Sequence, residues 1–191
     1  MKLSSPNAVS SAGNARGFTL VETLIAFALA GIVLGVLMTT WKYSGTSFAA
    51  MGNYANLDRQ SRAALDLLSR EIRNSSALIA VTNSPKSLTF VNATTGKQIT
   101  IQYDATAHTL KFFKTGQAAQ TVLTSCDQWD YSLFGRVPNM SSTNITFYST
   151  TDISACKLIN MNWKCSRTIF GSKRNTESIQ TAEIVLRNKV N

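Results

Sequence analysis

The sequence contains few side chains that could bind a metal or act as a catalytic base. Among 191 residues there is one histidine, His108, and there are three cysteines, Cys126, Cys156 and Cys165. No two cysteines form a CxxC motif, whereas a structural zinc site needs four nitrogen or sulfur ligands held close together. We therefore expect no metal site and no bound cofactor.

Motifs for nucleophilic or phosphate chemistry are also missing. No serine lies in a GxSxG sequence, and Gly96-Lys97 lacks the upstream glycine of a phosphate-binding loop. His108 lies in the polar stretch DATAHT, and a solvated turn explains Asp127 and Asp130 better than a catalytic carboxylate pair. We expect that the protein is not an enzyme.

Acidic residues are scarce, since 10 Asp and Glu face 19 Lys and Arg, for a net charge of +9. A basic surface attracts nucleic acid, anionic lipid or an acidic partner. The longest tight basic cluster is Lys173-Arg174, which is shorter than the runs that mark a nucleic-acid patch. A solvated basic face is the interpretation we favour.

One long apolar run, Phe18–Met38, lies near the N-terminus. As a helix it would span about 31 Å, close to the ~30 Å hydrocarbon core of a bilayer. Trp41, Lys42 and Tyr43 follow it, as is typical of a membrane interface, and Lys2 and Arg16 precede it. The pattern predicts a single-pass membrane helix at 18–40, with a cytoplasmic leader and an exported C-terminal domain.

Residues 1–17 are polar, small and basic, and we interpret them as a leader peptide. An ordinary secretory signal would be cut after its apolar block, whereas here Arg16-Gly17 stands before it. Glu22 is the single charge within the block, at a cost of about 2.5–3.5 kcal/mol near a membrane centre and less near an end. A cut before Phe18 would create an α-amine one helical turn from this carboxylate.

The stretch Gly17-Phe18-Thr19-Leu20-Val21-Glu22 and the apolar run after it resemble the class III signal of type IV prepilins and type II secretion pseudopilins, over residues 16–40. The resemblance implies that prepilin peptidase cuts between Gly17 and Phe18 and that Phe18 is then N-methylated. It also implies that Glu22 pairs with the N-terminus of a neighbouring subunit during filament assembly. No proline lies near Thr39, where major pilins often have one.

The expected order, a long helix followed by an antiparallel sheet, is similar to the J-type minor pseudopilins and the W-type minor pilins. This resemblance implies a tip subunit of a secretion pseudopilus or a pilus. Its partners would be prepilin peptidase, other pilin subunits, the inner-membrane assembly platform and, before assembly, membrane lipid. Two alternatives stay open: a single-span domain that never polymerises, and a competence-type pilin that binds DNA through Lys86, Lys97, Lys111, Lys114, Lys173 and Arg174.

Residues 41–80 form the predicted amphipathic continuation of the helix, with its clearest part at 57–73. Apolar or small residues recur there at intervals of three, four or seven, at Leu57, Ser61, Leu65, Leu68, Ile72 and Ile79. Residues 81–191 are predicted to be an exported β-rich domain, so that the fold class is α+β with the helix packed on an antiparallel sheet.

Two-residue alternation predicts strands at 87–92, 98–104, 110–114, 121–124, 144–150, 157–170 and 179–188. In the longest of these, Ile159, Met161, Trp163 and Cys165 should share the buried face. Residues 125–143 have few strand signals and are expected to form a loop anchored by aromatic side chains.

The long strand also limits the cysteine pairing. Cys156 and Cys165 would lie about 30 Å apart along it, whereas a disulfide needs Cα atoms within about 7 Å. Cys126 could bridge either of them, or all three could stay reduced. We favour a Cys126–Cys156 disulfide.

Overall fold

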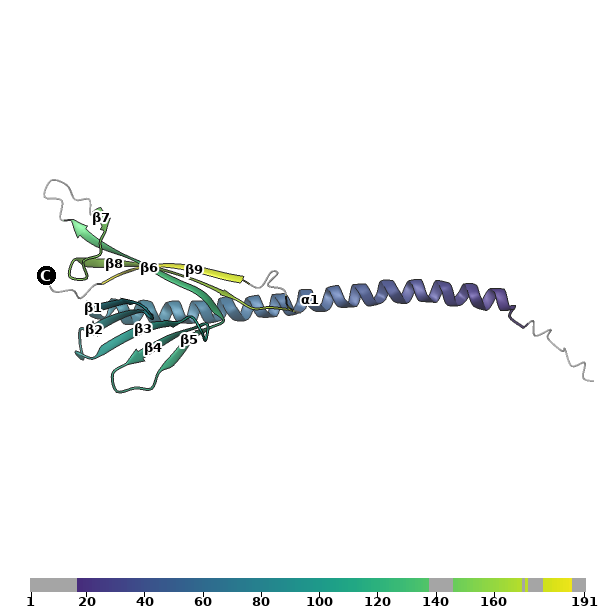
Figure 1. Cartoon of the computed structure of the whole chain (residues 1–191), viewed down its shortest axis with the longest axis horizontal. Coiled ribbons are helices and arrows are strands. Elements are labelled where there is room, and N and C mark those ends of the chain that lie inside the picture. Colours follow the sequence, from purple (N-terminus) through teal and green to yellow (C-terminus); the bar gives the residue numbers. More distant parts are fainter. Residues whose placement is uncertain (1–16, 138–145, 170, 172–176, 187–191) are drawn as a thin grey trace, which may run out of the picture. The chain divides into compact units, whose positions relative to one another are not determined.

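The computed structural model describes residues 17–137, 146–169, 171 and 177–186. Within these residues one long helix precedes nine strands (Figure 1). They are α1 (Leu20–Arg73), β1 (Ser75–Asn83), β2 (Lys86–Asn92), β3 (Gln98–Asp104), β4 (Thr109–Lys114), β5 (Gln120–Thr124), β6 (Cys126–Val137), β7 (Thr146–Ser149), β8 (Cys156–Ser166) and β9 (Glu177–Val185). The predicted α+β class is confirmed.

The chain divides into two compact units, Met1–Gly45 and Thr46–Asn191. The first holds the predicted spanning segment, and the second holds the rest of α1 and the described strands. Residues 1–16 of the predicted leader lie outside the described residues, as does the basic pair Lys173-Arg174.

In the first unit, three threonine hydroxyls of α1 hydrogen-bond to its own backbone. Thr23 donates to the Leu20 carbonyl at 2.8 Å, and Thr39 and Thr40 both donate to the Val36 carbonyl, at 2.8 and 2.9 Å. Polar groups in hydrocarbon need such internal partners because no water is present there. These threonines are therefore compatible with a membrane-spanning helix.

In the second unit, α1 buries one stripe of side chains. Its members are Leu57, Ser61, Ala64, Leu68 and Ile72, spaced by three or four residues as an amphipathic helix requires. Leu65, which was expected in the stripe, is partly buried and packs against the same core.

The helix ends at Arg73, as predicted for the helix at 57–73, whereas the outer bound of residue 80 given to the amphipathic segment is wrong. Ser75 donates its hydroxyl to the Glu71 carbonyl at 2.8 Å, and β1 begins there and pairs with β2. Ile79 therefore lies in β1, where it is 42% exposed. The spacing of seven residues between Ile72 and Ile79 matches a helical repeat. The segment nevertheless forms a strand, because its backbone pairs with the edge of β2.

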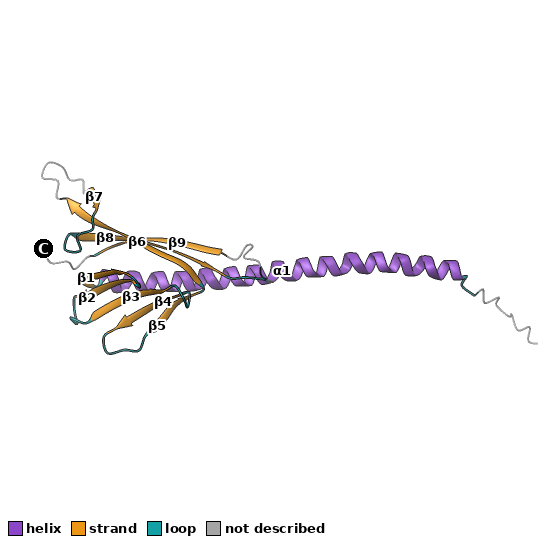
Figure 2. Ribbon diagram, in the orientation of Figure 1, coloured by secondary structure: helices purple, strands orange, loops and turns teal. Residues whose placement is uncertain are grey.

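Five of the described strands form an antiparallel sheet in the order β1-β2-β3-β4-β5, and Figure 2 labels each of them. The predictions for β2, β3, β4 and β5 are confirmed, and β1 was missed. Alternate side chains of this sheet enter the core, among them Leu88, Phe90, Ile99, Ile101 and Leu110.

The second sheet has the order β7-β6-β8-β9 and is also antiparallel. Ile159, Met161, Trp163 and Cys165 are all buried on β8, as predicted. The expectation of a loop at 125–143 is wrong for Cys126–Val137, which forms β6 and pairs with both β7 and β8, while residues 138–143 lie outside the described residues. Register shifts near each end of β6 interrupt its alternation and hide the two-residue period.

Both sheets hold the second half of α1. Trp163 of β8 donates its Nε1–H to the Ser61 hydroxyl at 3.3 Å. Thr124 of β5 donates to the Gln60 side-chain carbonyl at 2.9 Å, and Lys114 of β4 forms an ion pair with Glu71 at 3.3 Å. The helix and both sheets therefore share one hydrophobic core.

Candidate functional site

The first turn of α1 is capped by Thr19. Its hydroxyl oxygen accepts the Glu22 backbone N–H at 3.3 Å, and its carbonyl accepts the Thr23 N–H at 3.1 Å. Glu22 stands three residues after the cap, the spacing of a Thr-x-x-Glu capping box, where the helix dipole also favours a carboxylate. The sequence reasoning missed this second role of Glu22, although the spacing alone carries the signal.

The Gly17–Phe18 bond lies directly before this cap. Residues 17–19 have no regular secondary structure, and the Phe18 side chain is 79% exposed. Among the described residues, apart from the chain neighbours of Gly17, no atom lies within 4 Å of the point where a Cβ on Gly17 would stand. In this unit the bond is open to an enzyme, and a cut there would leave the Phe18 amine four residues before Glu22.

The apolar side chains that follow have no cover within the unit. Every large one from Phe18 to Met38 is at least 54% exposed. The helix is long and apolar enough to cross a membrane, and no part of its most apolar stretch is buried. Exposure on this scale indicates surroundings of lipid or of other helices rather than water.

A family model, the prokaryotic N-terminal methylation motif, matches residues 13–38. The N-terminal segment is a type IV prepilin-like signal. It contains Gly17, Phe18 and Glu22, and the apolar helix that follows is consistent with single-pass membrane anchoring. The comparison with curated proteins found no match, and the comparison with solved structures found none either.

Beyond the prepilin-like signal, the long helix followed by antiparallel sheets is a pilin-like architecture. The motif therefore supports a pilin-like or pseudopilin-like precursor, for which prepilin peptidase processing and pilin assembly are the general expectation. The individual roles of Gly17, Phe18 and Glu22 stay predictions.

The cysteines lie at different ends of the second sheet. Cys126 at the start of β6 is the cross-strand partner of Cys165 near the end of β8, and Cys156 faces Gly135. The favoured Cys126–Cys156 pairing is therefore wrong. It failed because β6 was taken for a loop, which hid the antiparallel register that carries Cys126 away from Cys156.

The Cys126 and Cys165 thiols interact directly. A hydrogen bond with Cys165, followed by burial, raises the pKa of Cys126 above its ordinary value. The pKa of Cys165 is lowered because its thiolate would accept hydrogen bonds from Cys126 and Ser61. Both side chains are almost fully buried, so neither thiol is positioned to react with a dissolved substrate.

Three of the lysines considered for DNA binding are paired with carboxylates. Lys86 contacts Asp130 at 2.5 Å, Lys111 contacts Asp104 at 3.0 Å, and Lys114 contacts Glu71 at 3.3 Å. Such pairing reduces the positive potential that a phosphate backbone would meet. The pairing of these three lysines counts against the DNA-binding alternative at their positions.

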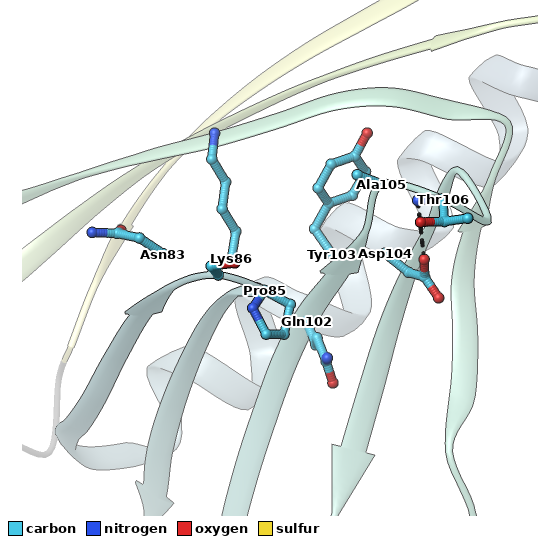
Figure 3. Close-up of a pocket in the computed structure, with 9 residues that line it drawn as sticks. Asn83, Pro85, Lys86, Gln102, Tyr103, Asp104, Ala105 and Thr106 are labelled. Atoms are coloured by element: carbon cyan, nitrogen blue, oxygen red, sulfur yellow. Dashed lines mark hydrogen bonds between the residues drawn. The ribbon is translucent and has the colours of Figure 1, made fainter.

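A shallow hollow lies between the β1–β2 turn and the end of β3 (Figure 3). Its charged groups are already engaged, since hydrogen bonds from the Ala107 backbone and from Lys111 lower the pKa of Asp104. Lys86 points away from the strand that carries it and reaches Asp130 of β6. No unpaired charge in this hollow indicates a ligand.

The residues considered for catalysis each interact with a different part of the fold. His108 occupies a turn with a positive φ of 51°, and its carbonyl accepts the Cys126 N–H. Asp127 accepts a hydrogen bond from the Ser166 hydroxyl, while Asp130 accepts one from Lys86. In the part of the chain that the structure describes, no group of three or more His, Cys, Asp or Glu residues could hold a metal ion.

Proposed function

We propose that this protein is a minor pilin-like subunit, cut between Gly17 and Phe18 by prepilin peptidase and assembled into a type II secretion pseudopilus or a type IV pilus. It serves as a structural subunit and not as an enzyme. The observation that carries the proposal is the methylation motif at residues 13–38, followed by a helix whose apolar side chains are exposed throughout.

Cleavage changes the chemistry around Glu22. In the precursor, this carboxylate lies in the first turn of α1, where the helix dipole stabilises it. Once the leader is removed, the Phe18 amine, which a methyl group leaves positively charged, becomes available as a partner. A charge pair between the Glu22 of one subunit and the amine of its neighbour would offset the cost of holding the carboxylate among apolar helices.

The helix surface suits packing against further helices. Ala26 and Ala30, and then Gly31 and Gly35, place small residues one turn apart. No atom lies within 4 Å of the Cβ positions of either glycine, so another backbone can approach closely there. The inner-membrane assembly platform would transfer this helix from lipid to the filament core.

Two features favour a minor tip subunit over a major one. α1 runs from Leu20 to Arg73 with no proline to interrupt it. The domain joins a long helix to two antiparallel sheets, the order similar to J-type and W-type minor subunits. A tip subunit would occur in few copies per filament and would contact other minor subunits.

N-terminal sequencing and intact mass of the membrane-extracted protein test this proposal. The expected product begins at Phe18 and is one methyl group heavier than the unmodified mature chain. Gly17→Val is the informative variant, because a Cβ at Gly17 would meet no atom of the other described residues and its replacement is therefore expected to act on peptidase recognition. Recovery of the wild-type chain with Met1 still attached would refute processing and favour a plain anchored domain.

Assembly is tested separately by crosslinking in cells that contain the remaining pilus or pseudopilus subunits. Crosslinks to other low-abundance subunits, at a small ratio to the main filament subunit, are expected for a tip position. Crosslinks that repeat along the filament would indicate a major subunit instead.

A further inference from the structure

Cys126 and Cys165 occupy a particular kind of position in the second sheet. The neighbouring pair is hydrogen-bonded, since the Ser166 N–H donates to the Ser125 carbonyl at 3.0 Å. The Cys126 N–H does not bond to Cys165 and donates instead to the His108 carbonyl at 2.8 Å. Because the two kinds of pair alternate along antiparallel strands, Cys126 and Cys165 form a non-hydrogen-bonded pair.

Such a pair meets the geometric requirement for a disulfide. Directly opposed residues at non-hydrogen-bonded positions have Cα atoms about 4.5 Å apart, and disulfides join Cα atoms about 4.4–6.8 Å apart. The pKa values of the two thiols are shifted in opposite directions, each chiefly by the other, which agrees with sulfur atoms that face each other. No backbone movement is needed to bring them together.

The third cysteine is excluded by the same register. Cys156 faces Gly135, near the opposite end of β6 from Cys126. It also lies on the same strand as Cys165, nine residues earlier, which is about 30 Å in an extended chain. Neither pairing that involves Cys156 can form without unfolding the sheet.

The cysteine pair lies where three parts of the domain meet. Ser125, with a positive φ of 57°, is the single residue between β5 of the first sheet and β6 of the second. Tyr103 of the first sheet donates its hydroxyl to the Cys126 and Asp127 carbonyls, at 3.2 and 2.7 Å. Ser61 of α1 contacts Cys165 from the helix side. A covalent bond here would join β6 to β8 within the second sheet, next to the point where both sheets and the helix meet.

We propose that Cys126 and Cys165 form a disulfide once the domain is exported, while Cys156 stays a thiol. This proposal rests on the proposed function only in assuming that the domain is exported. The two thiols together give up two protons and two electrons, and a dithiol oxidase or oxidised glutathione accepts them as its own disulfide is reduced to two thiols. One cysteine first forms a mixed disulfide with the oxidant, and the other then displaces it. Because both side chains are buried in the folded domain, this exchange takes place as the chain folds.

The bond is tested on the full chain in two samples. The first is extracted from membranes without reductant and alkylated under denaturing conditions with N-ethylmaleimide. The second is unfolded in detergent and denaturant, then refolded in a buffer of reduced and oxidised glutathione. Peptide mapping of each should give one adduct, on Cys156, and one linked peptide pair, Cys126 with Cys165, that separates on reduction.

Variants make the assignment specific. Cys156→Ser is the matched control and should keep the linked peptides, whereas Cys126→Ser and Cys165→Ser should each lose them. The bond closes a loop of about 40 residues, so reduction should lower the Tm of the wild-type domain by about 10 °C. The Tm of the Cys126→Ser/Cys165→Ser double variant should not respond to reductant.

Each outcome separates the pairing from the proposed function. Three adducts in the refolded chain, or a linked peptide that contains Cys156, would overturn the proposed pairing. Linked peptides in the refolded chain with three adducts in the membrane sample would uphold the pairing and count against export. The N-terminal sequence of the membrane sample reports on processing independently of both.

Discussion

Trp163 and Ser61 are joined by a hydrogen bond of 3.3 Å between the indole Nε1 and the hydroxyl oxygen, and both residues are at most 1% exposed. They are 102 positions apart in the sequence, one on β8 and the other on α1. Ser61 also helps to lower the pKa of the Cys165 thiol, so one small side chain on the helix acts on two positions of the same strand. This explains why a polar residue occupies the buried stripe of an amphipathic helix.

Ser61→Ala should lower the free energy of unfolding by about 1–2 kcal/mol, because the buried indole N–H loses its partner. Equilibrium unfolding in urea, followed by tryptophan fluorescence, measures the change. Ser69→Ala is the matched control on the same helix, since its hydroxyl bonds only to the Asp66 carbonyl at an exposed position. An equal effect of both substitutions would show that helix propensity, and not the indole contact, was responsible.

Leu68→Ala tests whether the second half of α1 is a true core element. Leu68 is fully buried, so the substitution should cost about 2–5 kcal/mol of domain stability through lost apolar contact and a residual cavity. Leu34→Ala makes the same chemical change on the same helix at a residue that is 57% exposed. The Tm of the domain should fall with Leu68→Ala and stay unchanged with Leu34→Ala, and similar shifts would contradict the core assignment.

The ion pair of Lys86 and Asp130 should make stability depend on pH. The hydrogen bond from Lys86 holds the pKa of Asp130 below its ordinary value. A carboxyl whose pKa is lowered by folding contributes stability above its unfolded pKa, about 3.9, and that contribution is lost as the pH falls through the lower folded pKa. Because both side chains are more than a third exposed, the contribution should be a few tenths of a kcal/mol.

Lys86→Met should therefore destabilise the domain slightly at pH 6 and hardly at all near pH 3, as measured by urea unfolding at each pH. Lys97→Met is the control, because it removes the same charge from an exposed turn where the structure gives no ion pair among the described residues. A constant difference between wild type and Lys86→Met across this range would refute the assignment of the pair.

Residues with a regular pattern could be predicted from the sequence, and those in irregular positions could not. The strands β2, β3, β4 and β8 alternate cleanly and were predicted, as was the buried face of Ile159, Met161, Trp163 and Cys165. β6 was missed because its register shifts place Asp127 and Phe134 out of alternation. The cysteine pairing failed for the same reason, since pairing across a sheet depends on the register of both strands.

The N-terminal signal could be predicted from the sequence alone. The order of Gly17, Phe18 and Glu22 before an apolar run is a local pattern that needs no tertiary contact, and the methylation motif matches it. The position of Ser61 beneath Trp163 could not have been predicted, because it depends on how a helix meets a strand about a hundred residues later.

Glu22→Gln separates the assembly role of this residue from its place in the helix cap. The substitution removes the charge but keeps the size of the side chain, and the Thr19 oxygen can still accept the backbone N–H of residue 22. Processing should continue, with the chain beginning at Phe18. Incorporation into filaments should fall about tenfold or more, because a charge-assisted hydrogen bond contributes about 1.5–3 kcal/mol.

Quantitative immunoblotting measures the ratio of the subunit in the filament fraction to that in the membrane fraction. Thr23→Ala, which removes only a hydroxyl bonded within the helix, should leave it unchanged. If Glu22→Gln enters filaments as well as wild type does, the carboxylate serves the helix cap alone and the amine is not its partner.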